Sequence, residues 1–165
     1  MKALVYRQKN TLDNFQIKLE EVPEPTMNEN DVLVSAKAFA VNPGDAYFRR
    51  TENPKVGGYR ILGYNFGGVI QKLGEKGKGF SVDDRVYGVG DSARQGSYAE
   101  RVAVDYRSIA KIPQTAPFDH VAGAPIVTMT AWESLYRDHN KLPEGVKNVL
   151  VLGAAGGVGT MAVRF

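Results

Sequence analysis

Residues 149–159 combine an apolar run with a glycine-rich turn, an arrangement that can bind a dinucleotide. Residues 149–152 have the composition of a strand buried on both faces of a parallel sheet, and residues 160–165 begin a helix. In such a strand–turn–helix unit, Gly156 would let the backbone approach a pyrophosphate, and Gly159 would let the helix pack closely on the strand. The first N–H groups of the helix would face the phosphates.

The glycine spacing departs from the strict dinucleotide motif at one position. Ala154 stands where GxGxxG has its first glycine, and a plain strand-to-helix corner is the alternative interpretation. The acidic residue that contacts the ribose, about 20 positions further on, would lie beyond Phe165. The sequence therefore predicts a dinucleotide site and leaves NADH and NADPH both open.

Composition excludes several other kinds of chemistry. The 165-residue chain has a net charge of +3, which is too small a bias to indicate nucleic-acid binding. It has no cysteine, so disulfides, thiolate metal sites and nucleophilic thiols are absent. The two histidines, His120 and His139, have no partner at metal-ligand spacing, and we predict no metal site. No apolar run reaches secretory or membrane-spanning length, which predicts a cytoplasmic protein.

Short strands separated by turns dominate the first two thirds of the chain. The candidate strands lie at residues 3–6, 15–19, 32–41, 61–70, 85–89 and 98–104. A short helix is expected at residues 47–50, and the glycines within 61–70 indicate a bend or a close backbone approach. After residue 113 the hydrophobic period becomes helical, with an interruption at Pro125. This pattern predicts a small barrel or sandwich, followed by helices and one parallel strand.

Five short motifs follow one another along the chain. They are residues 63–69 (GYNFGGV), 84–88 (DRVYG), 96–100 (GSYAE), 125–132 (PIVTMTAW) and 153–159 (GAAGGVG). In order and spacing they resemble the zinc-free quinone oxidoreductase branch of the medium-chain dehydrogenase/reductase superfamily, in its N-terminal portion. The resemblance covers the whole chain, and five motifs together are far more specific than any one of them.

The resemblance implies a mainly β fold with an α/β start of a second domain. Residues 1–113 would form a GroES-like barrel, the catalytic domain that binds the substrate. Residues 114–147 would be a helical connector, and residues 148–165 would be the first strand and turn of a truncated Rossmann domain. Because the glycine motif ends without its domain, we expect the chain to be a fragment that is inactive by itself.

The resemblance also identifies departures from the zinc-dependent branch. Asn42 stands where that branch has a cysteine ligand, Tyr64 where it has a histidine, and Asn65 where it has an acidic residue. We therefore expect no zinc. Reduction of a quinone or an α,β-unsaturated carbonyl then fits better than alcohol oxidation, because hydride addition gives a delocalised enolate or phenolate that needs only hydrogen-bond donors.

The resemblance implies roles for residues near the hydride-transfer site. The expected catalytic residues are Asn42, Tyr47 and Tyr64. Asn42 would bind the substrate or the nicotinamide, Tyr47 would offer a phenol as donor or proton source, and Tyr64 would lie in the pocket wall or the core. Asp45 is expected to be a structural partner of its turn. The expected cofactor contacts come from Asn42, Thr130, Ala155, Gly156, Gly157, Val158 and Gly159.

The expected cofactor is NADPH, with NADH not excluded, and the expected substrate is a small quinone or enone. We expect no nucleic-acid or membrane partner, and a homo-oligomer when the protein is full length. Two other functions stay open: a non-catalytic GroES-like binding or structural protein, and an alcohol dehydrogenase. The intact Asn42, Tyr47 and glycine turn favour the reductase over the first, and the missing zinc ligands oppose the second.

Overall fold

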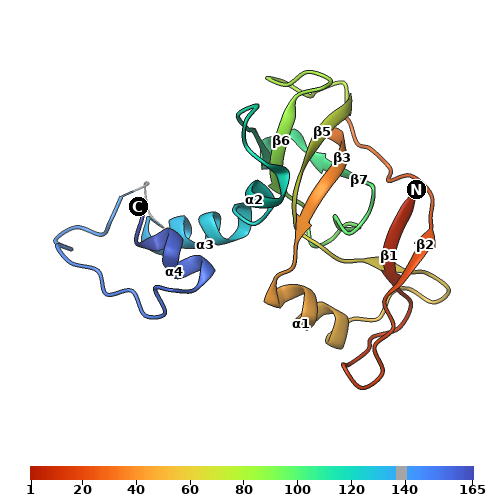
Figure 1. Cartoon of the computed structure of the whole chain (residues 1–165), viewed down its shortest axis with the longest axis horizontal. Coiled ribbons are helices and arrows are strands. Elements are labelled where there is room, and N and C mark those ends of the chain that lie inside the picture. Colours follow the sequence, from red (N-terminus) through yellow and green to blue (C-terminus); the bar gives the residue numbers. More distant parts are fainter. Residues whose placement is uncertain (137–140) are drawn as a thin grey trace. The chain divides into compact units, whose positions relative to one another are not determined.

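The computed structural model describes residues 1–136 and 141–165, so His139 lies outside the described residues. They form two compact units, unit 1 from Met1 to Gly123 and unit 2 from Ala124 to Phe165 (Figure 1). All named strands of the described chain fall in unit 1, in two antiparallel sheets. The mainly β fold expected from the sequence is therefore confirmed.

The smaller sheet contains the N-terminal strand at its centre. Strand β1 (Lys2–Tyr6) pairs on one side with β2 (Lys18–Glu21) and on the other with β4 (Arg60–Ile61). Alternate residues of β1 point into a hydrophobic core, where they pack against residues 61–62. The buried residues of this core are Ala3, Val5, Tyr6, Val22, Ile61, Leu62 and Tyr98. The apolar residues of β1 thus bury one face of the small sheet.

The larger sheet has five strands. Its members are β3 (Asp31–Ala40), β5 (Asn65–Leu73), β6 (Arg85–Val89), β7 (Arg101–Asp105) and β8 (Ile109–Lys111), in the order β7-β3-β5-β6-β8. Valines and other branched residues fill its buried face, as strand propensities favour. That core consists of Val32, Val34, Phe66, Ile70, Val86, Val102 and Val104.

Residues 96–100 link the two sheets through backbone hydrogen bonds. The Tyr98 N–H donates to the Leu62 carbonyl at 2.9 Å, and the Tyr98 carbonyl accepts from the Leu4 N–H at 2.8 Å. The Glu100 carbonyl then accepts from the Ala36 N–H of β3 at 3.0 Å. One extended segment therefore contacts β1 and β3, which belong to different sheets.

Two glycines in the 63–69 motif explain why this run differs from the single strand expected over 61–70. Gly63 has a φ of 97°, which an L side chain rarely adopts, and the chain bends there between β4 and β5. At Gly68 a Cβ would lie 2.2 Å from the Ser35 carbonyl oxygen of β3. The expected bend and close backbone approach are both present, at different glycines.

Helices are short, and two of them begin at proline. Helix α1 (Pro43–Thr51) and helix α3 (Pro125–Leu135) have proline in their first turn, where no backbone donor is needed. The others are a 3-10 turn at Tyr106–Ser108, α2 (Phe118–Ala122) and α4 (Gly157–Ala162). The helix expected over 47–50 and the interruption at Pro125 are both observed.

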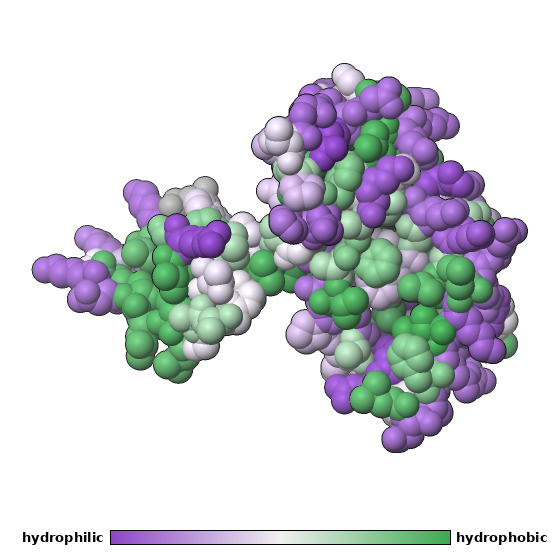
Figure 2. All heavy atoms as spheres, in the orientation of Figure 1, coloured by the Kyte–Doolittle hydropathy of each residue, from purple (hydrophilic) through white to green (hydrophobic). Residues whose placement is uncertain are grey.

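Two other expectations about strands were wrong, and one strand was not expected. Residues 149–152 form no strand, and Leu150 and Leu152 are each 85% exposed. A strand needs a hydrogen-bonding neighbour, and no segment of the described chain pairs with these residues. Apolar side chains accordingly gather on the surface of unit 2 (Figure 2). The strand expected over 15–19 begins only at Lys18, and β8 was not anticipated.

Among residues 1–136 and 141–165, no helix is both long enough and apolar enough to span a membrane.

The ion pair between Arg94 and Asp31 anchors the 91–95 loop to the start of β3. Both Asp31 carboxylate oxygens accept from the guanidinium, at 2.9 and 2.7 Å, and Asp31 is 2% exposed. Arg94→Ala should lower the free energy of unfolding by about 2 kcal/mol, because it removes the charged partner of a buried carboxylate. Urea unfolding measures this loss. Arg107→Ala, which removes an exposed partner of Asp105, is the control and should change little; equal losses in both variants would contradict the prediction.

Candidate functional site

The first turn of α1 places Asn42 and Asp45 in a reciprocal arrangement. Asn42 is extended, with φ −121° and ψ 156°, and precedes Pro43 at the start of the helix. The Asn42 N–H donates to Asp45 Oδ2 at 2.7 Å, and the Asp45 N–H donates to the Asn42 carbonyl at 3.0 Å. The Asn42 amide also donates to the Ala40 carbonyl at 3.3 Å. The end of β3 and the start of α1 are thus held together.

The Asp45 side chain is buried and contacts three different segments. It is 3% exposed. Its Oδ1 accepts from the Gly63 N–H at 3.0 Å, and its Oδ2 accepts from the Tyr98 hydroxyl at 2.9 Å in addition to the Asn42 N–H. This agrees with the structural role expected for Asp45, although the partners extend well beyond its own turn.

Tyr98 is the most perturbed phenol in this group. Burial raises its pKa far above the ordinary range, and the charge and hydrogen bond of Asp45 act in the same direction. The phenol therefore stays protonated at neutral pH and remains a donor to the carboxylate. Its ring also lies 4.4 Å, centre to centre, from the ring of Phe39.

An aromatic row connects the two tyrosines expected to be catalytic. Tyr47 on α1 is 56% exposed, and its ring lies 5.7 Å from that of Phe48 in an edge-to-face arrangement. The Phe48 ring lies 5.8 Å from the ring of Tyr64. Tyr47 therefore presents a phenol at the surface, whereas Tyr64 lies deeper on the same row.

Tyr64 lies beside the start of β5 in a partly buried environment. Burial raises the pKa of its hydroxyl, and the positive charge of Arg60 partly opposes this effect. Arg60 is the register partner of Tyr6 across β1 and β4, so their side chains share one face of the small sheet. Burial raises the pKa of the Tyr6 hydroxyl as well. Tyr64 is thus partly buried, and its role as pocket wall or core residue stays a prediction.

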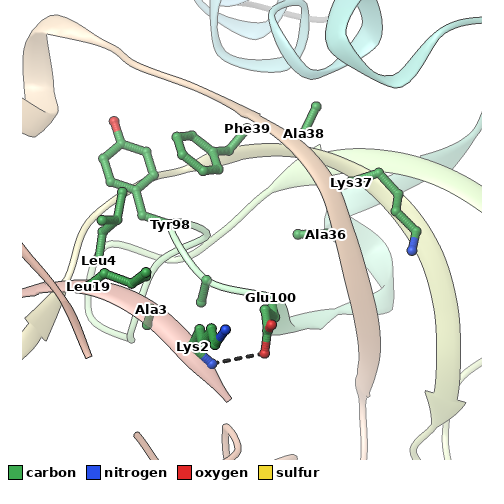
Figure 3. A pocket seen from close by; sticks show the side chains of 11 residues that line it. Lys2, Ala3, Leu4, Leu19, Ala36, Lys37, Ala38, Phe39, Tyr98 and Glu100 are labelled. Carbon is green, nitrogen blue, oxygen red and sulfur yellow. Dashed lines mark hydrogen bonds between the residues drawn. The ribbon is translucent and has the colours of Figure 1, made fainter. Parts of the chain in front are cut away.

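A cavity of about 600 Å³ lies between β1, β3 and the 98–100 segment (Figure 3). The Phe39 and Tyr98 rings lie side by side at one end, and Glu100 accepts from the Lys2 N–H at 2.9 Å at the other. None of the residues expected to be functional lines this cavity. Sequence reasoning missed it because its walls come from segments at least 15 residues apart along the chain, and no local motif marks their proximity.

The glycine turn of unit 2 leads directly into α4. Gly153 has a φ of 70°, and Gly156 caps the helix in an extended conformation. Ala155, Gly156, Gly157 and Val158 are exposed, whereas Gly159 is buried. A Cβ at Gly159 would lie 2.3 Å from the Gly153 carbonyl oxygen. The close approach expected at Gly159 is present, but it is made to the turn itself and not to a strand.

Thr130 and Trp132 lie on α3 in unit 2. Thr130 is exposed, and its carbonyl accepts from the Ser134 hydroxyl at 2.6 Å. The Trp132 ring lies 4.6 Å from Tyr136 and 5.2 Å from Phe165. Trp132 thus packs within unit 2, while the backbone groups of the turn and the Thr130 side chain are open to solvent.

The expected site residues fall into two sets. The structure brings Asn42, Tyr47 and Tyr64 together around α1 in unit 1, and it places Thr130 and residues 155–159 in unit 2. Within the described ranges, no group of three or more histidine or acidic side chains could hold a metal ion. The asparagine and tyrosine in unit 1 are also poor ligands for zinc, which favours thiolate, imidazole and carboxylate donors.

Comparison with known proteins gives a consistent family match. Residues 28–114 match the family described as alcohol dehydrogenase GroES-like domain. The chain is 35% identical over 175 aligned positions, 99% of its length, to the 2-methylene-furan-3-one reductase of Solanum lycopersicum. It is 35% identical, again over 99% of its length, to the chloroplastic NADPH-dependent alkenal/one oxidoreductase of Arabidopsis thaliana.

A solved structure agrees with these matches. The quinone oxidoreductase of Coxiella burnetii superposes on 99% of the chain with a TM-score of 0.80 and 25% identity, and the chain covers 52% of that protein. The chain covers 43% and 44% of the two plant enzymes. It therefore spans about half the length of the relatives it matches, in their N-terminal portion.

The close contact at Gly159 implies that the glycine turn does not tolerate a side chain at this position. Gly159→Ala should destabilise unit 2 by about 1–3 kcal/mol, because the added methyl would collide with the Gly153 carbonyl and force the backbone to move. Thermal unfolding followed by Trp132 fluorescence reports on this unit, since Trp132 is the only tryptophan. In the matched variant Gly156→Ala the Cβ would meet the same oxygen at 3.3 Å. If both variants unfold at the same temperature, the packing argument fails.

Proposed function

The chain belongs to the alcohol dehydrogenase GroES-like domain family, and we propose that it serves in the NADPH-dependent reduction of α,β-unsaturated carbonyl compounds or quinones by hydride transfer. The observation that carries this proposal is the set of Asn42, Tyr47 and Tyr64 around α1, which offers hydrogen-bond donors and lacks zinc-ligand chemistry. The names of the two plant relatives and of the Coxiella burnetii protein are consistent with enone and quinone substrates.

The residues of the glycine turn fit a dinucleotide. Ala155 to Val158 are exposed, so the backbone N–H groups at the start of α4 are open to a phosphate. Gly156 has no side chain to hold a ligand away, and Gly159 keeps the turn compact. We propose that these residues and Thr130 hold NADPH, with NADH as the alternative. The cofactor would supply the hydride, and the protein would supply orientation.

The unit 1 residues would then stabilise the charge that hydride addition creates. When the β-carbon of an enone receives a hydride, negative charge moves to the carbonyl oxygen. We propose that Asn42 donates its amide to the substrate or the nicotinamide, and that the exposed Tyr47 hydroxyl donates a hydrogen bond or a proton to the product enolate. Tyr64, being deeper, would form the wall beside them. The raised pKa of the Tyr64 hydroxyl keeps it protonated at neutral pH.

The remaining assignments extend the same proposal. Residues 1–113 would form the substrate-binding domain, residues 114–147 a helical connector, and residues 148–165 the start of the nucleotide-binding domain. A cytoplasmic location and a homo-oligomer in the full-length protein stay predictions. Alcohol oxidation with catalytic zinc is a weaker candidate, because Asn42 and Tyr64 offer an amide and a phenol in place of the usual zinc donors.

Turnover tests the reaction type. The test uses a chimera in which residues 1–165 replace the matching part of the tomato relative. Because the chimera contains the rest of a full-length reductase, a lack of activity could not be attributed to missing sequence. We expect it to oxidise NADPH with 2-cyclohexenone or a benzoquinone but not with cyclohexanone, and a chelator should not change the rate.

In this chimera Tyr47→Phe should lower kcat by about 100-fold, the size of a lost general acid. Tyr106→Phe, outside the site, is the control. A chimera that binds NADPH and oxidises only alcohols would reject the proposal.

Nucleotide binding can be measured on the 165-residue chain itself. Adding NADPH should quench Trp132 emission with a saturable curve, because Trp132 belongs to the same unit as the glycine turn. Gly156→Ala should weaken binding by about tenfold, or about 1.4 kcal/mol, since a methyl would stand between the backbone and the phosphates. Gly145→Ala, outside the turn, is the control. Identical affinities for all three proteins would place the nucleotide elsewhere.

A further inference from the structure

One buried carboxylate contacts both segments that carry the proposed catalytic residues of unit 1. Asp45 accepts from the N–H of Asn42 at 2.7 Å and from the N–H of Gly63, the residue before Tyr64, at 3.0 Å. Asn42 and Gly63 are 21 positions apart in the sequence. They are joined at a single side chain that is itself 3% exposed.

We propose that Asp45 is a positioning residue, which sets the spacing between Asn42 and Tyr64 through these two backbone hydrogen bonds while Tyr98 orients its carboxylate. The proposal rests on the proposed function, because it concerns residues assigned there to substrate and cofactor. It assigns Asp45 no contact with the reacting atoms. Because the side chain is 3% exposed, the carboxylate has no route to a substrate.

All three partners of Asp45 donate to its carboxylate. Both backbone N–H groups can only donate, and the Tyr98 hydroxyl donates to the same oxygen as Asn42 at 2.9 Å. A side chain that only accepts can satisfy all three donors. No ion pair involving Asp45 is found in the part of the chain that the structure describes. The buried carboxylate is therefore stabilised by these hydrogen bonds.

The hydrogen bond from Tyr98 fixes the orientation of the Asp45 carboxylate. Its backbone is fixed by hydrogen bonds to Leu62 and Leu4, in two different segments, and its ring packs on Phe39. The hydroxyl thus approaches Asp45 from a fixed frame. Rotation of the Asp45 side chain would break the bond from Tyr98 together with one of the two backbone bonds, so the three partners restrict it to one rotamer.

The substitution Asp45→Asn distinguishes positioning from simple filling of space. The asparagine has almost the same shape, but one of its two terminal atoms is a donor. The asparagine oxygen can accept either from Gly63 or from Asn42 and Tyr98. In each case its NH₂ group faces the remaining backbone N–H, which can only donate. The variant should therefore fold with its packing retained and lose one of the two backbone links, to Asn42 or to Gly63.

The first experiment uses the wild-type 165-residue chain and no substrate. Long-range NMR couplings across hydrogen bonds should connect the amide nitrogens of both Asn42 and Gly63 to the side-chain carboxyl carbon of Asp45. Detection of both couplings is expected. Absence of both, in spectra that show couplings across the β3–β5 ladder, would overturn the proposal even if no variant can be purified.

The second experiment compares amide hydrogen exchange in the wild type, Asp45→Asn, Tyr98→Phe and Asp31→Asn. In Asp45→Asn the amide of either Asn42 or Gly63 should exchange at least tenfold faster, the change expected from losing a hydrogen bond to a carboxylate. Tyr98→Phe removes only the phenol and should change the Asn42 exchange rate less. Asp31→Asn removes another buried carboxylate of unit 1 and should leave the Asn42 and Gly63 rates unaltered. Equal acceleration in Asp31→Asn and Asp45→Asn would mean general destabilisation and would overturn the proposal.

Turnover by the chimera completes the test. Asp45→Asn should lower kcat by about 10–100-fold with a smaller change in KM for the enone, because misplacement affects the transition state more than substrate binding. An unchanged kcat together with an altered Asn42 or Gly63 amide would refute the positioning role. If the unmutated chimera has no reductase activity, the proposed function fails, whereas the couplings and exchange rates still decide whether Asp45 fixes the two segments.

Discussion

Unit 1 depends on the hydrogen bonds that residues 96–100 make to both sheets. The three-stranded and five-stranded sheets share no named strand pair, and the Tyr98 and Glu100 backbones connect them through Leu4, Leu62 and Ala36. Each sheet needs a second layer to cover its apolar face, and this segment sets how the two meet within the unit. It also brings the Tyr98 side chain to the point where α1 begins.

The buried carboxylate of Asp45 depends on that arrangement. Moving a charge out of water is costly unless donors replace the water, and Asp45 has three donors from three segments. The same hydrogen bonds bring Asn42 close to the segment that continues into Tyr64. The stability of the core and the geometry of the proposed site are therefore coupled. A substitution that moves Asn42, Gly63 or Tyr98 would also shift the other two residues.

Unit 2 contrasts with this well-connected arrangement. Its glycine turn leads into α4 as the sequence predicts, because the conformations of Gly153 and Gly159 follow from local backbone contacts. Residues 149–152 have the composition of a buried strand but lie exposed without a pairing partner among the described residues. A turn is specified by its own residues, whereas a strand requires another strand.

Local signals in the sequence determined much of the fold. The positions of β1, β3, β6 and α1, the bend at Gly63 and the turn at residues 153–159 all follow from apolar alternation, from proline and from the backbone freedom of glycine. The family resemblance assigned Asn42, Tyr47 and Tyr64 to one domain, and all three lie in unit 1. Only the tertiary structure decided that the Asp45 carboxylate joins Asn42 to Gly63, that Tyr98 is its third partner, and that a cavity lies between β1 and β3. Apart from the local Asn42–Asp45 bond, these contacts link residues 18 to 98 positions apart. No local pattern encodes them, because they exist only after the two sheets have packed.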